Sequence, residues 1–193
     1  IQIPRRLPNG PVDIMVDSTG LKVFGDGEWK ARKHGTSKRR TWRKLHLGVD
    51  PNTHDVVVAQ LTTVSVSDGE MLPELLDQLD DDQATGEVCG DGAYDQSGCY
   101  DGVLRRGGTL RTPPRKDAVE WDDDHPRTQA VRDCETGEGR KTWKRKTGYH
   151  RRSLSETAMF RYKTLIGPTL RARSFETQQV EAYAALAVIN RIN

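Results

Sequence analysis

Two short apolar runs, far apart in the chain, each lead into an aspartate, and this feature narrows the possible folds more than any other. Residues 12–17 end in Asp17, and residues 87–91 end in Asp91. Short apolar runs bounded by turn signals are typical of buried strands. The Ser-Thr-Gly sequence at 18–20 predicts a turn directly after Asp17. Taken alone, Asp17 is better explained as a simple turn-starting residue, since Asp is common before a Gly turn.

The segments between and after these runs alternate between strand and helix patterns. Two strand patterns at residues 45–49 and 56–63 flank a turn cluster, and a third follows at residues 109–113. Helical spacing of apolar residues predicts helices over residues 68–79, 94–106 and 175–192. The last helix is expected to pack through Val180, Tyr183, Ala184, Ala187 and Val188.

The segment from residue 149 to residue 163 carries an acid among cations at helical spacing. Offsets of 0, 3, 7 and 14 place one narrow stripe on a helix, made of Tyr149, Arg152, Glu156 and Lys163. Apolar residues at Leu154, Ala158, Tyr162 and Leu165 would face a core. A competing interpretation is a capping box, in which Ser153 and Glu156 only close the helix start.

Three strands, a helix, a strand, a helix, a strand and a late helix follow the order of an RNase H-like fold. The predicted fold is therefore α/β, with a mixed sheet of three antiparallel strands plus parallel strands, flanked by helices. In that order the fourth strand lies parallel to the central first strand, so Asp17 and Asp91 become neighbours. The late helix would bring Glu156 across them. Residues 1–11 are predicted to be a linker, residues 12–193 the domain, and residues 115–146 a small insertion before the late helix.

Three motifs together resemble one known family. They are the spacing Y-x2-R-x3-E-x6-K from Tyr149 to Lys163, the segment 16–50 and the sequence GDGAYD at 90–95. The chain resembles bacterial and archaeal insertion-sequence transposases with a DDE catalytic triad. Members usually carry an N-terminal DNA-binding and multimerising region, which we expect to be absent from this chain.

The resemblance implies that Asp17, Asp91 and Glu156 are the catalytic residues and the metal ligands. They would hold two Mg²⁺ ions, for which Mn²⁺ can substitute; such ions take oxygen ligands and serve phosphodiester chemistry. Water would first cut one strand at the end of the element. The freed 3′-hydroxyl would then attack a second phosphodiester in target DNA.

The resemblance also implies DNA contacts around the acids. Arg152 and Lys163 would grip phosphates near the cut, and Tyr149 would bond to or stack on the strand end. A tryptophan in the insertion, Trp143 or Trp121, could hold a flipped base, although a structural tryptophan is the competing interpretation. The implied partners are the double-stranded terminal repeats and target DNA, bound by a homodimer.

Charge is segregated along the chain although the net charge is only +2. Residues 30–44 contain eight Lys or Arg and no acid, and residues 140–152 contain seven and no acid. Such blocks predict cationic surfaces for a polyanion, and a solvated surface without a partner is the alternative. The first block is predicted to be a loop or arm that contacts phosphates through Lys38, Arg39, Arg40, Arg43 and Lys44.

Several other classes of protein are disfavoured. Three cysteines without a CxxC pair argue against a disulfide framework or a structural zinc site, and the five histidines lack metal-ligand spacing. No apolar run approaches the ~20 residues of a membrane span, so we expect an intracellular protein near the nucleoid. Two alternatives stay open: a nuclease or resolvase without strand transfer, and a DNA-binding remnant without catalysis.

Overall fold

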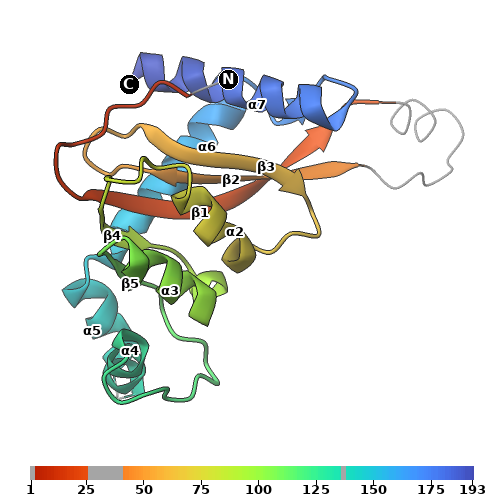
Figure 1. Cartoon of the computed structure of the whole chain (residues 1–193). Helices are drawn as coiled ribbons and strands as arrows, with labels where there is room; N and C mark the ends of the chain where they lie inside the picture. Colours follow the sequence, from red (N-terminus) through yellow and green to blue (C-terminus); the bar gives the residue numbers. More distant parts are fainter. Residues whose placement is uncertain (1–2, 26–40, 136–137) are drawn as a thin grey trace, which may run out of the picture.

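A mixed sheet forms the centre of the domain (Figure 1). The computed structural model describes residues 3–25, 41–135 and 138–193. The strand order is β3-β2-β1-β4-β5, and β6 pairs with β1. The strands are β1 (Val12–Val23), β2 (Trp42–Val49), β3 (Val56–Thr63), β4 (Thr85–Cys89), β5 (Thr109–Arg111) and β6 (Thr169–Leu170). The first three strands are antiparallel, whereas β4 runs parallel to β1 and β5 parallel to β4. The predicted mixed α/β fold is therefore confirmed.

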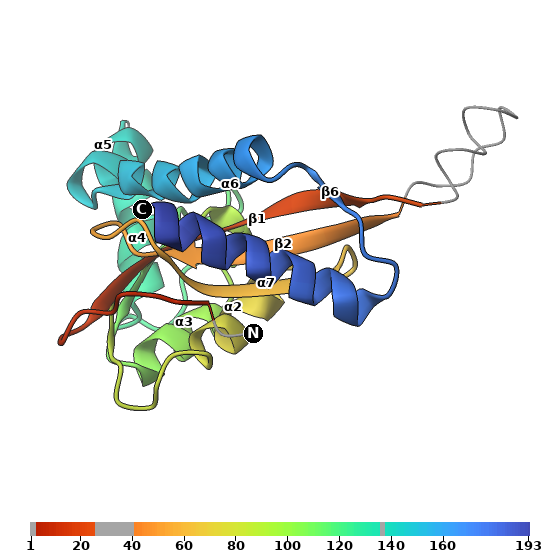
Figure 2. The same ribbon diagram turned by 90° about the horizontal axis from the view of Figure 1, so that it is seen from above.

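Helices cover both faces of this sheet (Figures 1 and 2). One core cluster joins β1 and β4 to α2 (Asp68–Leu76) and α3 (Ser97–Arg105). A second cluster joins β2 and β3 to α6 (Ser153–Leu165) and α7 (Phe175–Ile192). The short helices η1 (Gly92–Tyr94) and η2 (Tyr149–Arg152) precede α3 and α6. No described helix has both the length and the apolar character needed to cross a bilayer.

Strand β1 continues well past Asp17, so the turn predicted at residues 18–20 is wrong. Its pairing with β2 runs without interruption from Met15 opposite Val49 to Lys22 opposite Trp42. Because β2 begins at Trp42, three residues before the predicted start, every residue of β1 from Met15 to Lys22 has a partner in β2. Asp17 consequently lies inside a long strand, opposite Leu47.

The bounds of α7 match the predicted helix, but its predicted packing face is wrong. Val180 and Val188 are 49% and 47% exposed, whereas Gln178 and Asn190 are buried. Asn190 accepts a hydrogen bond from the Val56 amide and donates one to the Val56 carbonyl, each at 2.8 Å. The packed face consists of these two polar residues with Ala182, Ala185, Leu186 and Ile189, so it is rotated about the helix axis from the predicted face. The polar pair lies on it because its hydrogen bonds are satisfied.

Helix α6 also differs from its prediction. The predicted stripe of Tyr149, Arg152, Glu156 and Lys163 does not lie on one continuous helix. Its first two residues belong to η2, and α6 begins after them at Ser153. Ala158 and Tyr162 are buried as expected, and Met159 joins them in the core. Leu165, expected in the core, is 55% exposed at the end of α6. The capping box is also absent, since no side chain caps the start of this helix.

The segment predicted to be an insertion contains two helices, α4 (Pro126–Glu135) and α5 (Gly139–Lys146), which lie beside the β5 edge of the sheet (Figure 1). A buried ion pair fixes it to the sheet: the Arg127 guanidinium donates to both oxygens of Asp95, at 2.6 and 3.0 Å. The same guanidinium lies 4.3 Å from the Trp121 ring centroid. Removing one partner of such a pair leaves an uncompensated buried charge, which typically costs about 3–5 kcal/mol.

The described part of the predicted linker lies against the domain. Arg5 donates to the Val57 carbonyl at 2.6 Å, and Arg6 pairs with the buried Asp55 at 2.8 Å. Leu7 packs against the core cluster of α2 and α3. These contacts place the segment along β3.

On the sheet face opposite α6, a polar cluster supports the start of α2. Asp68 lies 3.2 Å from Nδ1 of the buried His46 and 3.4 Å from the Lys44 ammonium. Burial opposes ionisation of Asp68, but the neighbouring side chains of His46 and Ser18 and the charge of Lys44 outweigh it and lower the pKa to about 2.

Because this pKa is below the ordinary value of 3.8, ionised Asp68 stabilises the fold above about pH 4, and the contribution disappears as the pH falls toward 2. Asp68→Asn should therefore lower the free energy of unfolding at pH 7 by about 2 kcal/mol. It should also flatten the acid dependence below pH 4. Urea titrations at several pH values test this, with the exposed Asp82→Asn as control; equal stability of the variant and the parent at pH 7 would contradict the assignment.

Candidate catalytic carboxylates and nucleic-acid interface

Asp17 and Asp91 are brought together by the parallel pairing of β1 with β4. Met15 pairs with Cys89, and each aspartate follows two residues later in its own strand direction. Because parallel strands advance together with a spacing of about 4.8 Å, the two carboxylates lie close together where β4 ends beside β1. The Gly90 amide still donates to the Arg111 carbonyl at 3.2 Å, so the chain stays in register beyond Cys89.

The turn that carries Asp91 is held by its own hydrogen bonds. Asp91 caps η1, where its Oδ1 accepts the Ala93 amide at 2.8 Å. The Thr112 hydroxyl donates to the Asp91 carbonyl, which ties this turn to the end of β5. Gly90 allows the turn, because a Cβ there would lie 2.5 Å from the Tyr94 ring. These contacts fix the direction in which Asp91 leaves the sheet.

Arg152 links Asp17 to Glu156. One guanidinium nitrogen, Nη1, donates to Asp17 Oδ2 at 2.8 Å, and Nη2 donates to Glu156 Oε1. Asp17 is largely buried, whereas the Glu156 side chain is 56% exposed. Glu156 therefore projects from α6 over the sheet edge, and an arginine spans the space between the two acids.

The electrostatics of Asp17 reflect this crowding. Burial is the largest cause that raises the pKa of Asp17, and the negative charges of Asp91 and Glu156 add to it. The Ser18 amide, which donates to Asp17 Oδ1 at 2.8 Å, and the charge of Arg152 act in the opposite direction without cancelling the rise. All three predicted acids thus interact electrostatically.

The donor set fits divalent metal ions in its chemistry. Asp17, Asp91 and Glu156 offer only carboxylate oxygens, the ligands that Mg²⁺ and Mn²⁺ prefer. In the described part of the chain, no group of three or more His, Cys, Asp or Glu side chains is already drawn together as a closed metal site. The Arg152 guanidinium instead supplies the positive charge between Asp17 and Glu156. A metal ion at this point would compete with Arg152 for the carboxylates.

Of the predicted DNA-contacting residues near Glu156, Trp143, Tyr149 and Arg152 form one cluster, and Lys163 lies apart from it. Trp143 is buried, and its ring centroid lies 5.7 Å from that of Tyr149. The Lys144 ammonium lies 5.2 Å from the Tyr149 ring centroid, and the Arg152 guanidinium lies 6.0 Å from it. Burial raises the pKa of Tyr149 to about 12, so its hydroxyl stays protonated. Lys163 lies two turns further along α6, about 10 Å from Glu156.

The residues predicted in the first basic block separate into two groups. Lys38, Arg39 and Arg40 lie outside the described residues. Arg43 and Lys44 belong to β2 and not to a loop. The Arg43 guanidinium donates to the Gln178 side chain at 2.9 Å, and the Lys44 ammonium donates to the Val66 carbonyl at 2.8 Å. Both therefore make contacts within the domain.

The sequence interpretation overlooked a second set of charged residues beside the acids. Arg151 pairs with Asp13 at 2.9 Å, and Arg151 also lies 3.6 Å from Glu87. Asp13 and Asp17 are four residues apart in one strand, so their side chains share a face of the sheet. That spacing was the available signal.

The sheet order, with three antiparallel strands followed by parallel ones, is that of an RNase H-like domain. The sequence profile described as the Transposase DDE domain matches residues 8–191, and the chain belongs to this family. Among solved structures, the chain is similar to the piggyBac transposase in a synaptic complex with hairpin DNA, with a TM-score of 0.57 and 8% sequence identity. The match covers 94% of this chain and 46% of the other, so this chain spans less than half of that transposase.

Since the pKa of Asp17 is raised, its ionised carboxylate destabilises the metal-free fold at neutral pH. This penalty appears as the pH rises from the unfolded value of 3.8 through the higher folded value. Asp17→Asn should therefore raise the midpoint of thermal unfolding at pH 7 in the presence of a chelator. Added Mn²⁺ should stabilise the parent and not the variant. The exposed Asp101→Asn is the matched control; an equal Mn²⁺ effect on all three proteins would remove Asp17 from the metal site.

Proposed function

We propose that this domain cleaves DNA at the ends of a transposable element with divalent metal ions and then joins the freed 3′-hydroxyl to target DNA. The observation that carries the proposal is the register of β1 and β4, in which Met15 pairs with Cys89 and the two aspartates follow in parallel. Family membership supports transposase chemistry in general. The finer assignment rests on the three acids.

In this proposal the three acids come from different elements and bind the same metal ions. Asp17, Asp91 and Glu156 would hold two Mg²⁺ ions, with Mn²⁺ as a substitute. When bound, such ions neutralise the charge that develops on the entering and leaving oxygens of an in-line displacement. Arg152 would turn from the acids to a phosphate near the cut, where its planar group makes paired hydrogen bonds. Tyr149 and Lys163 would contact the same strand.

The surface that leads to the acids suits a polyanion. Lys141, Lys144, Arg145 and Lys146 are exposed on α5, directly before η2 and Glu156. Such a run raises the local concentration of DNA and contacts phosphates without reading sequence. The similar transposase is described in complex with hairpin DNA, which supports double-stranded DNA as the partner here. Assembly as a homodimer on terminal repeats and target DNA completes the proposal.

Replacing Glu156 by Gln tests the catalytic assignment directly. The change keeps the shape of the side chain but removes a metal-binding charge. Mn²⁺-dependent nicking of plasmid DNA should fall by more than the ~10–100-fold that loss of an outer-shell partner costs. DNA affinity should stay within about twofold, and the exposed Glu74→Gln serves as control. Nicking retained at the level of the parent would overturn the assignment.

Replacing both Arg39 and Arg40 by Ala tests the arm. If each contacts a phosphate, binding should weaken equally for all DNA sequences. The slope of log affinity against log salt should decrease by about 0.9 for each lost contact. Fluorescence anisotropy with two unrelated duplexes at several salt concentrations gives this slope. Weakening confined to one of the duplexes would show base reading instead.

The same preparations separate the alternatives. An assay with pre-cut element ends and a target plasmid measures strand transfer. Cutting without joined product would identify a nuclease or resolvase. DNA binding that persists without cutting, and that does not change when Asp91 is replaced by Ala, would identify a catalytically silent remnant.

A further inference from the structure

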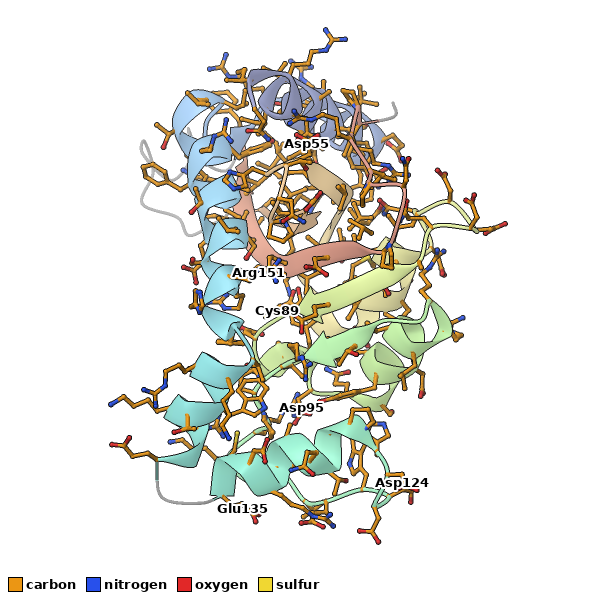
Figure 3. All side chains as sticks on the ribbon, turned by 90° about the vertical axis from the view of Figure 1, so that its left-hand side faces the viewer. Asp55, Cys89, Asp95, Asp124, Glu135 and Arg151 are labelled. Atoms are coloured by element: carbon orange, nitrogen blue, oxygen red, sulfur yellow. The ribbon has the colours of Figure 1, made fainter. Side chains whose placement is uncertain are left out.

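Two adjacent arginines of η2 hold two aspartates on the same face of β1. Arg151 Nη2 donates to Asp13 Oδ2 at 2.9 Å, and Arg152 Nη1 donates to Asp17 Oδ2 at 2.8 Å. Figure 3 shows Arg151 where the chain passes into α6, close to β1 and to the strand of Cys89. The start of α6, and with it Glu156, is therefore attached to β1 at two points.

The Asp13 carboxylate is fixed in place by the sheet itself. The register of β1 and β4 shifts between Val12 and Ile14, so Asp13 lies at an irregularity of the ladder. Its Oδ1 accepts the Glu87 amide at 2.8 Å and thus replaces a missing backbone acceptor. Gly86 gives the carboxylate room, because a Cβ there would lie 2.4 Å from Asp13 Oδ1. Irregularities of this kind re-aim side chains, and here one aims a carboxylate at Arg151.

Arg151 also reaches β4. Its Nη1 lies 3.6 Å from Glu87 Oε2, while Glu87 Oε1 accepts a hydrogen bond from Arg111 at 3.2 Å. The Arg151 side chain is 33% exposed and that of Asp13 is 26% exposed, so solvent screens this ion pair only in part. One guanidinium consequently connects η2 to two neighbouring strands, the same two that carry Asp17 and Asp91.

Metal ions and DNA would affect the two arginines differently. Arg152 binds the acids that would hold metal ions, and it is also the residue proposed to contact a phosphate. Metal binding to the acids and phosphate binding to Arg152 would both favour its departure from Asp17. Asp13 and Glu87 are turned toward Arg151 and the β4 backbone, so the Arg151 contacts need not break when DNA and metal bind.

We propose that Arg151 is a positioning residue that keeps η2 and the start of α6 on β1 and β4 after Arg152 has released the acids. This inference rests on the proposed function. It assigns Arg151 no contact with DNA or metal. Its role is to keep Glu156 above Asp17 when the first attachment point is lost.

Hydrogen exchange of the amides at 149–156 tests this role in two states. The states are the free protein, and the protein with a short random-sequence duplex and Ca²⁺, which replaces Mg²⁺ to limit turnover. In the free protein, Arg151→Ala should leave exchange within about twofold of the parent, because Arg152 still holds η2. In the complex, exchange should increase about tenfold or more, since opening of this segment is then unopposed.

Nicking of plasmid DNA with Mn²⁺ is the second measurement. Arg151→Ala should slow it by about 10–100-fold, the range for a residue that orients a ligand. DNA affinity should remain within about twofold. The nicking rate of Arg151→Lys should lie between those of the parent and of Arg151→Ala, because an ammonium cannot bind Asp13 and Glu87 together as a planar guanidinium does. Arg105→Ala, which removes an exposed arginine from α3, is the charge-matched control.

Two results would overturn the inference. Equal acceleration of exchange in the free protein and in the complex would make Arg151 an ordinary stabilising residue, and no acceleration in either state would show that it holds nothing. Failure of the parent to nick DNA would instead count against the proposed function. In that case the exchange comparison still decides whether Arg151 holds η2 in the DNA complex.

Discussion

The ion pairs from Arg152 to Asp17 and Glu156 balance the negative charge that the fold concentrates beside the end of β4. Parallel pairing of β1 with β4 forces Asp17 and Asp91 together, and α6 adds a third acid. Like charges this close disfavour ionisation, and burial of Asp17 increases the penalty. An arginine between two of the acids relieves the repulsion in the absence of metal. In this structure the acids are therefore held by a cation from the protein itself.

The order of the elements could be predicted because each depends on local pattern. The strand β3 and the helix α7 have the predicted bounds, and the neighbourhood of Asp17 and Asp91 follows from the strand order alone. The end of β1 could not be predicted from its own residues. A Ser-Thr-Gly sequence turns when unpaired, but β2 begins early enough to keep it extended. Likewise, α7 carries two alternative apolar stripes, and the one that packs contains Ala182, Leu186 and Ile189 together with buried Gln178 and Asn190. Only the contact with β3 decides between the two stripes.

The roles of the cations were harder to predict than the positions of the acids. Arg43 and Lys44 belong to a basic block in sequence, yet in the fold they meet Gln178 and the Val66 carbonyl. A run of basic residues predicts local charge but not where each side chain points, because that depends on the strand or helix that carries the residue. Alternation along β1 was a better guide. It places Asp13 on the face of Asp17, and each of the two adjacent arginines of η2 then binds one of these aspartates.

The three acids differ in how firmly the protein holds them. Asp17 sits within a continuous ladder, and Asp91 caps a turn whose far end is fixed by the buried pair of Asp95 and Arg127. Glu156 is 56% exposed, and an arginine holds its carboxylate. Two rigid acids and one adjustable acid would let the site assemble fully only when a ligand draws Arg152 away. The start of α6 would then have to stay packed on the sheet after Arg152 has left the acids, because Glu156 lies within the first turn of the helix. An anchor outside the acids meets this requirement, and Asp13 provides it at the one irregular point of the β1–β4 pairing.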